Sequence, residues 1–219
     1  MNYSTADELL DLEVPKEVRS VLYPMFLRGT KAFEELINEE AFMFNSTFLN
    51  NCKGQLRTFL IFRQFDADLL SSNFPFSVVP KEVNHCRYTT LNLQRGNVLI
   101  NVAKEAKQTR LPSRSKFRLD ACKTNNFRQN TLFFDENGQV QEEPYYLLLT
   151  YGYRYGSLNF VDLVVPDVNM RDVLAVRSLK SEYVMQPKSL EEKELEEELL
   201  VKLKYDAIEQ LKVKAIANG

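Results

Sequence analysis

The chain has 219 residues, of which 44% are hydrophobic and 26% are charged, as is ordinary for a folded globular protein. The net charge of −2 argues neither for nor against a polyanionic partner, and the longest strongly apolar run, at 144–153, is too short to cross a membrane. Three widely spaced cysteines favour free thiols over a disulfide framework, and the acidic N-terminus predicts no signal peptide. We therefore expect a soluble, cytoplasmic protein with no membrane partner.

Helices are predicted at the start of the chain. Thr5 and Glu8 have the spacing of a capping box, in which both side chains bond backbone N–H groups of the first turn. Pro24 is expected to bend or end a helix, because proline lacks the N–H that a helix interior needs. Gly29-Thr30 is interpreted as a helix end followed by a new N-cap. Asn45-Ser46-Thr47 offers a further cap before another helix.

Two β-hairpins are predicted in the middle of the chain. Residues 86–93 alternate between two faces, Arg95-Gly96-Asn97 supplies a turn, and an apolar run returns at 98–103. The stretch 144–165 has two arms rich in aromatic and branched residues, with two glycines between them. Because both arms are almost continuously apolar, we place this hairpin at the centre of a sheet. A short strand is expected at 76–79.

The remaining elements are less regular. Residues 104–130 are polar and basic, with one strand expected at 116–122 and another at 131–134. After Pro166, Asp167 is expected to cap a short helix that holds Met170, Val173 and Leu174. A final helix at 189–216 carries apolar residues at every fourth position: Leu195, Leu199, Leu203, Ala207, Leu211 and Ala215. Such a repeat drifts around a helix, so we expect the stripe to wrap over a domain rather than to form a simple two-stranded coiled coil.

Together these elements predict an α+β fold. Helices precede the strands instead of alternating with them, which favours an N-terminal helical layer packed on a mainly antiparallel sheet of five or six strands. We expect a single domain at 1–186, with helices at 1–70 and the sheet at 76–165. Residues 187–219 are expected to form a C-terminal helix used for docking or oligomerisation.

Charge is distributed unevenly along the chain. Residues 1–50 hold nine acidic and four basic residues, whereas residues 85–128 hold ten basic and two acidic ones. Such segregation can create a positive surface on a protein with little net charge. Arginine binds phosphate oxygens in a bidentate manner, and short hydroxyls and amides add further donors.

This segment predicts a nucleic-acid-binding surface. Its candidate residues are Arg87, Arg95, Lys104, Lys107, Arg110, Arg114, Lys116, Arg118, Asn125 and Arg128. The alternative is a solvated loop whose cations pair with the acidic N-terminal helices or with the Glu-rich C-terminal helix.

A second candidate is the tip of the 144–165 hairpin. Tyr153, Arg154 and Tyr155 could stack on bases if their side chains are exposed, as in proteins that bind single strands. The alternative is that the tyrosines pack onto neighbouring strands, as most aromatic side chains in strands do.

Catalytic chemistry has little support in the sequence. His85 is the only histidine, so a zinc site or a serine–histidine system would depend on one residue, and we expect a structural role for it. Asp120 and Asp162, on separate strands, could hold magnesium for phosphodiester cleavage, but surface carboxylates are the simpler interpretation for them and for Glu142 and Glu143. No phosphate-binding glycine loop or hydrolase motif is present. No catalytic residue, metal or cofactor is therefore predicted.

The sequence favours a non-enzymatic protein that binds DNA or RNA through residues 85–128. The first alternative is a protein-interaction module, a regulator or inhibitor that acts through its acidic helices or its C-terminal helix. That helix could also form a homodimer. The second alternative is a magnesium-dependent nuclease.

Overall fold

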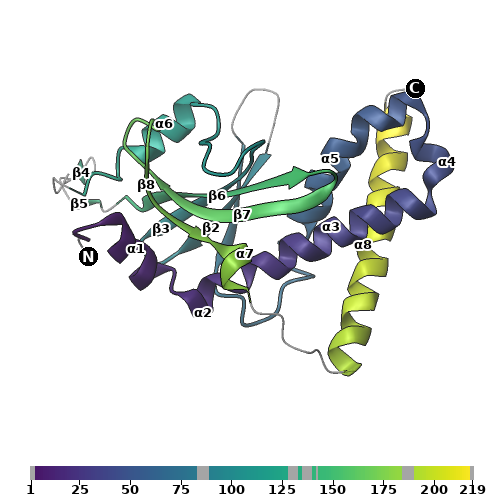
Figure 1. Cartoon of the computed structure of the whole chain (residues 1–219), viewed down its shortest axis with the longest axis horizontal. Helices are drawn as coiled ribbons and strands as arrows, with labels where there is room; N and C mark the ends of the chain where they lie inside the picture. Colours follow the sequence, from purple (N-terminus) through teal and green to yellow (C-terminus); the bar gives the residue numbers. More distant parts are fainter. Residues whose placement is uncertain are drawn as a thin grey trace. The chain divides into compact units, whose positions relative to one another are not determined.

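The computed structural model describes residues 3–82, 89–127, 133–134, 140–141, 143–183 and 190–217 (Figure 1). The chain forms two compact units, each assembled from separate segments. The sheet unit comprises Met1–Tyr23 and Asn73–Tyr183, and the helical unit comprises Pro24–Ser72 and Val184–Gly219. The boundary expected after residue 186 lies outside the described residues.

A six-stranded sheet forms the centre of the sheet unit, with the strand order β1-β2-β3-β6-β7-β8. The strands are β1 (Ser77–Glu82), β2 (Thr89–Arg95), β3 (Val98–Lys104), β6 (Tyr145–Arg154), β7 (Ser157–Pro166) and β8 (Val173–Ser178). All neighbouring pairs are antiparallel except β3 and β6, which are parallel because a long crossover connects them. The predicted α+β class with a mainly antiparallel sheet is confirmed.

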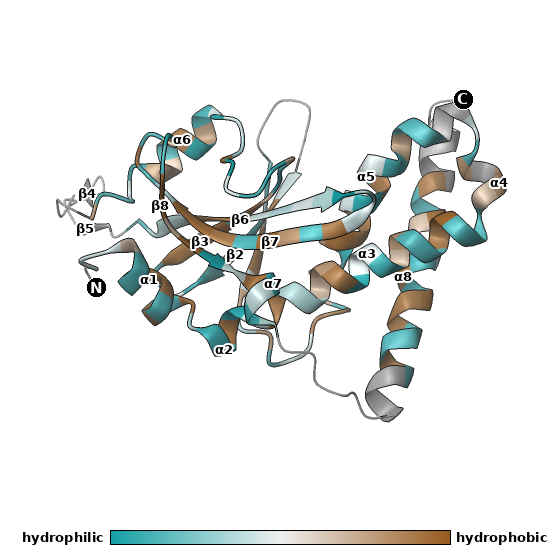
Figure 2. Cartoon of the chain, in the orientation of Figure 1, coloured by the Kyte–Doolittle hydropathy of each residue, from teal (hydrophilic) through white to brown (hydrophobic). Residues whose placement is uncertain are grey.

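The β6–β7 hairpin lies inside the sheet, as predicted. Most of its residues are buried, and β7 is largely hydrophobic along its length (Figure 2). Tyr155 and Gly156 both have positive φ angles, 52° and 89°, which is the geometry of a two-residue turn between twisted strands.

The crossover from β3 to β6 contains α6 (Lys116–Cys122), where a strand was predicted. That prediction is wrong because Phe117 and Ala121, and likewise Leu119 and Cys122, are also separated by about one helical turn. Ser115 caps the helix by accepting a hydrogen bond from the backbone N–H of Arg118. Phe117 and Cys122 then reach a core cluster on the sheet that includes Tyr146. The crossover also contains a two-stranded ladder of β4 (Phe133–Phe134) and β5 (Val140–Gln141).

The prediction of a short helix after Pro166 is also wrong. A carboxylate oxygen of Asp167 accepts hydrogen bonds from the backbone N–H groups of Arg171 and Asp172, at 2.5 and 3.1 Å. The φ angle of Met170 is +50°, which a right-handed helix does not allow. Asp167 therefore closes a turn that leads directly into β8.

Three helices complete the sheet unit: α1 (Ala6–Glu13), α2 (Lys16–Arg19) and α7 (Leu179–Glu182). Thr5 caps α1 as predicted, because its side chain accepts from the backbone N–H of Glu8, while the Glu8 carboxylate accepts from the N–H of Ser4. Helix α1 contacts β8.

The helical unit is built from α3 (Leu22–Glu39), α4 (Ala41–Phe44), α5 (Thr47–Arg63) and α8 (Leu190–Ala217). Helix α3 continues past Pro24, which lies in its first turn, where backbone N–H groups need no helical partner, so the helix does not end there. It also runs through Gly29-Thr30, and the helix end predicted there is wrong. A Cβ at Gly29 would lie 2.9 Å from the Cα of Ile61, so this glycine allows α3 and α5 to approach each other.

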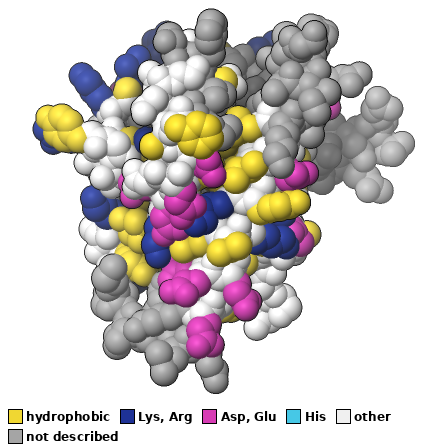
Figure 3. Space-filling view, turned by 90° about the vertical axis from the view of Figure 1, so that its right-hand side faces the viewer, with side chains coloured by type: hydrophobic (Ala, Val, Ile, Leu, Met, Phe, Trp, Pro, Cys, Tyr) yellow, Lys and Arg dark blue, Asp and Glu magenta, His cyan; other side chains and the backbone are white. Residues whose placement is uncertain are grey.

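Helix α8 packs on α3, α4 and α5 through a seam that differs from the predicted stripe. Leu200, Leu203 and Ala207 are buried in this core, whereas Leu195 is 58% exposed. These buried positions follow steps of three and four residues, the spacing of one helix face. Hydrophobic side chains also lie among acidic and basic ones on the face that Figure 3 presents. Among the described residues, no helix is both long and apolar enough to span a membrane.

Candidate nucleic-acid interface

The centre of the candidate site is the basic loop, which we define as residues 104–116. It leaves the end of β3 and crosses the sheet before entering α6. Leu111 packs against the core cluster of Tyr146, Leu148 and Val164. The side-chain amide of Gln108 donates to a carboxylate oxygen of Asp162 at 3.3 Å. The backbone of the loop is therefore held against the sheet, while its charged side chains are free to face solvent.

Five cations of the basic loop are exposed: Lys104, Lys107, Arg110, Arg114 and Lys116. Within the described part of the chain, none of them forms an ion pair within 4.0 Å of a carboxylate. The structure thus brings together five unpaired positive charges over a short stretch.

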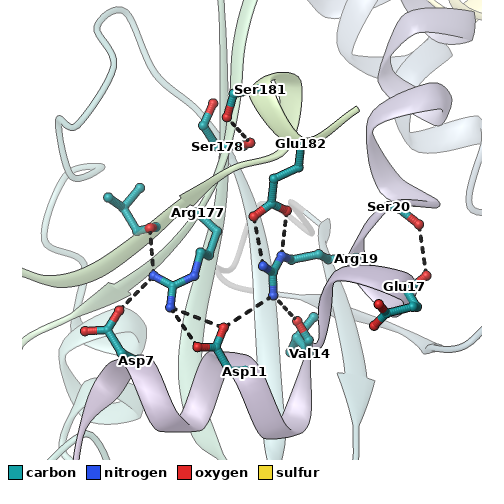
Figure 4. Close-up of polar contacts among 11 residues, drawn as sticks. Asp7, Asp11, Val14, Glu17, Arg19, Ser20, Arg177, Ser178, Ser181 and Glu182 are labelled. Carbon is teal, nitrogen blue, oxygen red and sulfur yellow. Dashed lines mark hydrogen bonds and ion pairs between the residues drawn. The ribbon is translucent and has the colours of Figure 1, made fainter. Parts of the chain in front are cut away.

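The acidic N-terminal residues are instead paired with other arginines of the sheet unit (Figure 4). Arg177 contacts Asp7 and Asp11 at 2.7 and 3.1 Å. Arg19 donates to both carboxylate oxygens of Glu182, at 2.7 and 2.8 Å, and also lies 3.8 Å from Asp11. Asp7 and Asp11 therefore contact these arginines and no cation of the basic loop.

Five acids of the helical unit form ion pairs with cations of that unit: Glu35, Glu39, Asp66, Asp68 and Asp206. Arg63 contacts Asp66, Asp68 and Asp206, and its hydrogen bonds hold the pKa of Asp68 well below its usual range. Lys204 lies 3.3 Å from Glu35 and 2.8 Å from Glu39.

Three of the predicted site residues are half-buried or buried in structural contacts. Arg95 donates to the backbone carbonyls of Glu13 and Pro75. Arg118 donates to the side chain of Asn101 and to the carbonyl of Ser113. These two side chains are half-buried, so the candidate interface does not include them.

Asn125, the third, is only 2% exposed. Its amide nitrogen donates to the carbonyls of Tyr146 and Pro166, and its oxygen accepts from the N–H of Tyr146. This side chain therefore connects the crossover to β6 and β7 by hydrogen bonds. The predicted Arg87 and Arg128 lie outside the described residues.

The hairpin tip presents an aromatic side chain next to cations. Tyr155 is 94% exposed, and the guanidinium of Arg154 lies 5.3 Å from its ring centroid. Tyr153 is half-buried, and the Lys104 ammonium lies 5.7 Å from its ring centroid. The tip therefore adjoins the start of the basic loop, and Tyr155 is the aromatic side chain available for stacking.

A groove borders the other end of the basic loop. One wall is formed by residues 109–114 and the other by residues 170–173, around a volume of about 630 Å³. The second wall adds Arg171, which is exposed and which the sequence analysis missed. No local signal marks Arg171, because only the fold brings the β7–β8 turn beside the loop.

The carboxylates considered for magnesium lie on different elements. Asp120 is exposed on α6 and accepts from the Lys123 ammonium at 2.7 Å, which lowers its pKa. Asp162 is fully buried on β7, and burial raises its pKa. Glu143 is exposed, and Glu142 is outside the described residues. The described residues contain no group of three or more metal-ligating side chains.

The thiol of Cys122 is not set up for nucleophilic chemistry. Its side chain is fully buried, and burial raises its pKa to about 12, so the thiolate is not formed at neutral pH. His85 and Cys86 lie outside the described residues.

The raised pKa of Asp162 leads us to expect a specific pH dependence of stability. Because its pKa is raised above 3.8 in the folded protein, the folded state keeps the proton at pH values where the unfolded state has lost it. The free energy of unfolding should therefore fall as pH rises from about 4 through the raised pKa. Asp162→Asn should lack this component, which urea unfolding of both proteins across pH would detect. Parallel curves for the two proteins would contradict the assignment.

These features define an α+β protein whose central sheet displays a basic loop, an exposed tyrosine and an arginine-lined groove. Comparisons with known protein families, with curated proteins and with solved structures found no match for this chain.

Proposed function

We propose that this protein binds nucleic acid without catalysing a reaction, and that the basic loop contacts the phosphate backbone. The observation that carries the proposal is the pairing pattern: Asp7 and Asp11 of α1 contact Arg177, and Asp11 also contacts Arg19, while five cations of the loop face solvent unpaired. Binding such side chains to phosphates releases counterions and requires no internal ion pair to be broken first.

The hairpin tip favours a single-stranded ligand. Tyr155 is almost fully exposed, and Arg154 lies close to its ring. A base that stacks on an aromatic side chain contributes about 1–3 kcal/mol and must be unstacked from its neighbours, as bases in single strands are. We therefore propose that a single strand runs along the loop and stacks one base on Tyr155.

Charge-neutralising variants test this function. Lys107, Arg110 and Lys116 are exposed, and no side-chain hydrogen bond or ion pair joins them to the described residues. The triple variant Lys107→Gln, Arg110→Gln and Lys116→Gln should bind a fluorescent single-stranded oligonucleotide more weakly by on the order of tenfold per lost contact at low salt.

A matched triple variant controls for net charge. Lys16→Gln, Lys31→Gln and Lys53→Gln removes the same charge from residues outside the basic loop and should leave the affinity within about twofold, because these residues have no part in the proposed phosphate contacts. Equal weakening by both triple variants would argue against a defined interface. Absence of oligonucleotide binding by the unmodified protein would overturn the proposal.

A protein-interaction role is the second candidate, and exposed apolar residues on α8 favour it. Val201 and Tyr205 are each 62% exposed and line a shallow depression with Glu194 and Glu198. They lie on a different face of α8 from the buried Leu203 and Ala207. Partner capture that withstands nuclease and is lost in Val201→Ser/Tyr205→Ser would support this role. A monomer–dimer shift in sedimentation would identify a second copy as the partner.

We also propose a cytoplasmic location. The buried Cys122 is a free thiol, as cysteines in proteins of reducing compartments usually are.

A further inference from the structure

The groove between residues 109–114 and 170–173 has two walls that are each fixed by their own hydrogen bonds. In the second wall, the backbone N–H groups of Arg171 and Asp172 donate to the Asp167 side chain, and the Asp167 N–H donates to the Asp172 carbonyl. In the first wall, Leu111 is anchored in the core cluster and Pro112 is buried. The groove is therefore formed before any ligand arrives.

Arg114 connects the two walls. Its Nε donates to the backbone carbonyl of Met170 at 3.1 Å. This bond uses the nitrogen nearest the backbone and orients the guanidinium. Its two terminal nitrogens have no partner among the described residues, so they remain available for an acceptor in the groove.

The charge of the groove is strongly positive. Arg110, Arg114 and Arg171 line it together with one acid, Asp172, and none of the three arginines forms an ion pair within the described chain. Thr109 and Ser113 also line the groove, and the Thr109 hydroxyl donates to the carbonyl of Gln108. Guanidinium groups gathered in one small space are the donors that bind phosphate oxygens.

We propose that this groove binds a phosphomonoester, the terminal phosphate of a nucleic-acid strand. Three arginines and one aspartate leave an excess of about two positive charges, which matches the charge of −1.5 to −2 on a phosphomonoester at pH 7. A phosphodiester inside a strand carries only one negative charge and matches less well. The identity of the ligand as a strand end rests on the proposed nucleic-acid-binding function, whereas the recognition of phosphate depends on the groove alone.

Four ligands separate the sources of the phosphate group: a single-stranded oligonucleotide with a 5′-phosphate, the same strand with a 3′-phosphate, the strand with hydroxyl ends, and adenosine monophosphate. Inorganic phosphate serves as a competitor. We expect a phosphorylated strand to bind about tenfold more tightly than the hydroxyl-ended strand at pH 7.5, since charge-assisted bonds to a dianion are strong. This preference should decline below about pH 6, where the phosphomonoester takes up a proton.

Arg171→Gln is the sharpest variant, because Arg171 lies outside the basic loop and only its backbone N–H forms a hydrogen bond among the described residues. It should abolish the preference for a phosphorylated end while leaving the hydroxyl-ended strand bound. Arg110→Gln should weaken binding of both strands. Lys16→Gln, an exposed cation on α2, should change neither affinity.

The outcomes distinguish this inference from the proposed function. Equal binding of all strands, or an unchanged preference in Arg171→Gln, overturns the phosphomonoester site and leaves the nucleic-acid-binding function standing. Binding of adenosine monophosphate and inorganic phosphate without binding of any strand supports the groove and overturns the function. Absence of binding by every ligand overturns both.

Discussion

Replacing Asn125 by alanine should lower the free energy of unfolding by about 3–5 kcal/mol, because three buried backbone groups would lose their hydrogen-bond partner. The side chain donates to the carbonyls of Tyr146 and Pro166 at 2.7 and 2.8 Å and accepts from the N–H of Tyr146 at 2.9 Å. At 2% exposure, water cannot easily replace these bonds. Urea unfolding followed by circular dichroism would measure the change.

Asn159→Ala provides the matched control for this substitution. Asn159 is exposed on β7, and only its backbone carbonyl accepts a hydrogen bond, from Lys180. Its loss should change stability by less than about 0.5 kcal/mol. If Asn125→Ala instead weakened oligonucleotide binding with little change in stability, Asn125 would belong to the binding surface, as the sequence suggested.

Arg19→Met should destabilise the sheet unit by about 3–5 kcal/mol, because it would leave the carboxylate of Glu182 without its partner in a largely buried site. The Arg19 side chain is 6% exposed and that of Glu182 is 20% exposed. Arg19 also donates to the carbonyl of Val14 at 2.7 Å, so its loss removes a bond at the end of α1 as well.

The double variant Arg19→Met/Glu182→Leu separates the ion pair from the packing of its side chains. Replacing both charges by apolar groups should recover most of the lost stability, because neither side chain then leaves a charge unpaired. A double variant as unstable as the sum of the single variants would contradict this account. Neither variant should alter nucleic-acid binding, because Arg19 and Glu182 lie outside the basic loop and the groove.

The parts of the fold that depend on local signals could be predicted from the sequence. The cap at Thr5 and the hairpin turn at Tyr155-Gly156 depend on residues within one turn of each other. The errors arose where distant contacts decide the structure. Glycine ends a helix in many proteins, but Gly29 lies inside α3, where it faces Ile61 of α5. Asp167 has the chemistry of a helix cap, yet the positive φ of Met170 turns the chain into β8.

The candidate site could be predicted only in part, for the same reason. Exposure of Lys107 and Arg110 follows from a polar loop, and the sequence indicated it. Arg118 and Asn125 lie in the same polar, basic segment. Their hydrogen-bond partners, Asn101 and Tyr146, are far away in the sequence, so the segment alone did not show that they are buried or half-buried. Arg171 joins the basic loop only because the β7–β8 turn lies next to it. Charge along a sequence therefore shows which cations are present, and the fold decides which of them remain unpaired.

The salt dependence of oligonucleotide binding tests the central claim most directly. If the five exposed cations of the basic loop each neutralise one phosphate of a single strand, log affinity should fall against log salt concentration with a slope of about −3.5. The triple variant of Lys107, Arg110 and Lys116 should reduce this slope by about 2. Binding that is absent at low salt, or an affinity that does not change with salt, would contradict the claim that these cations form a phosphate-binding surface.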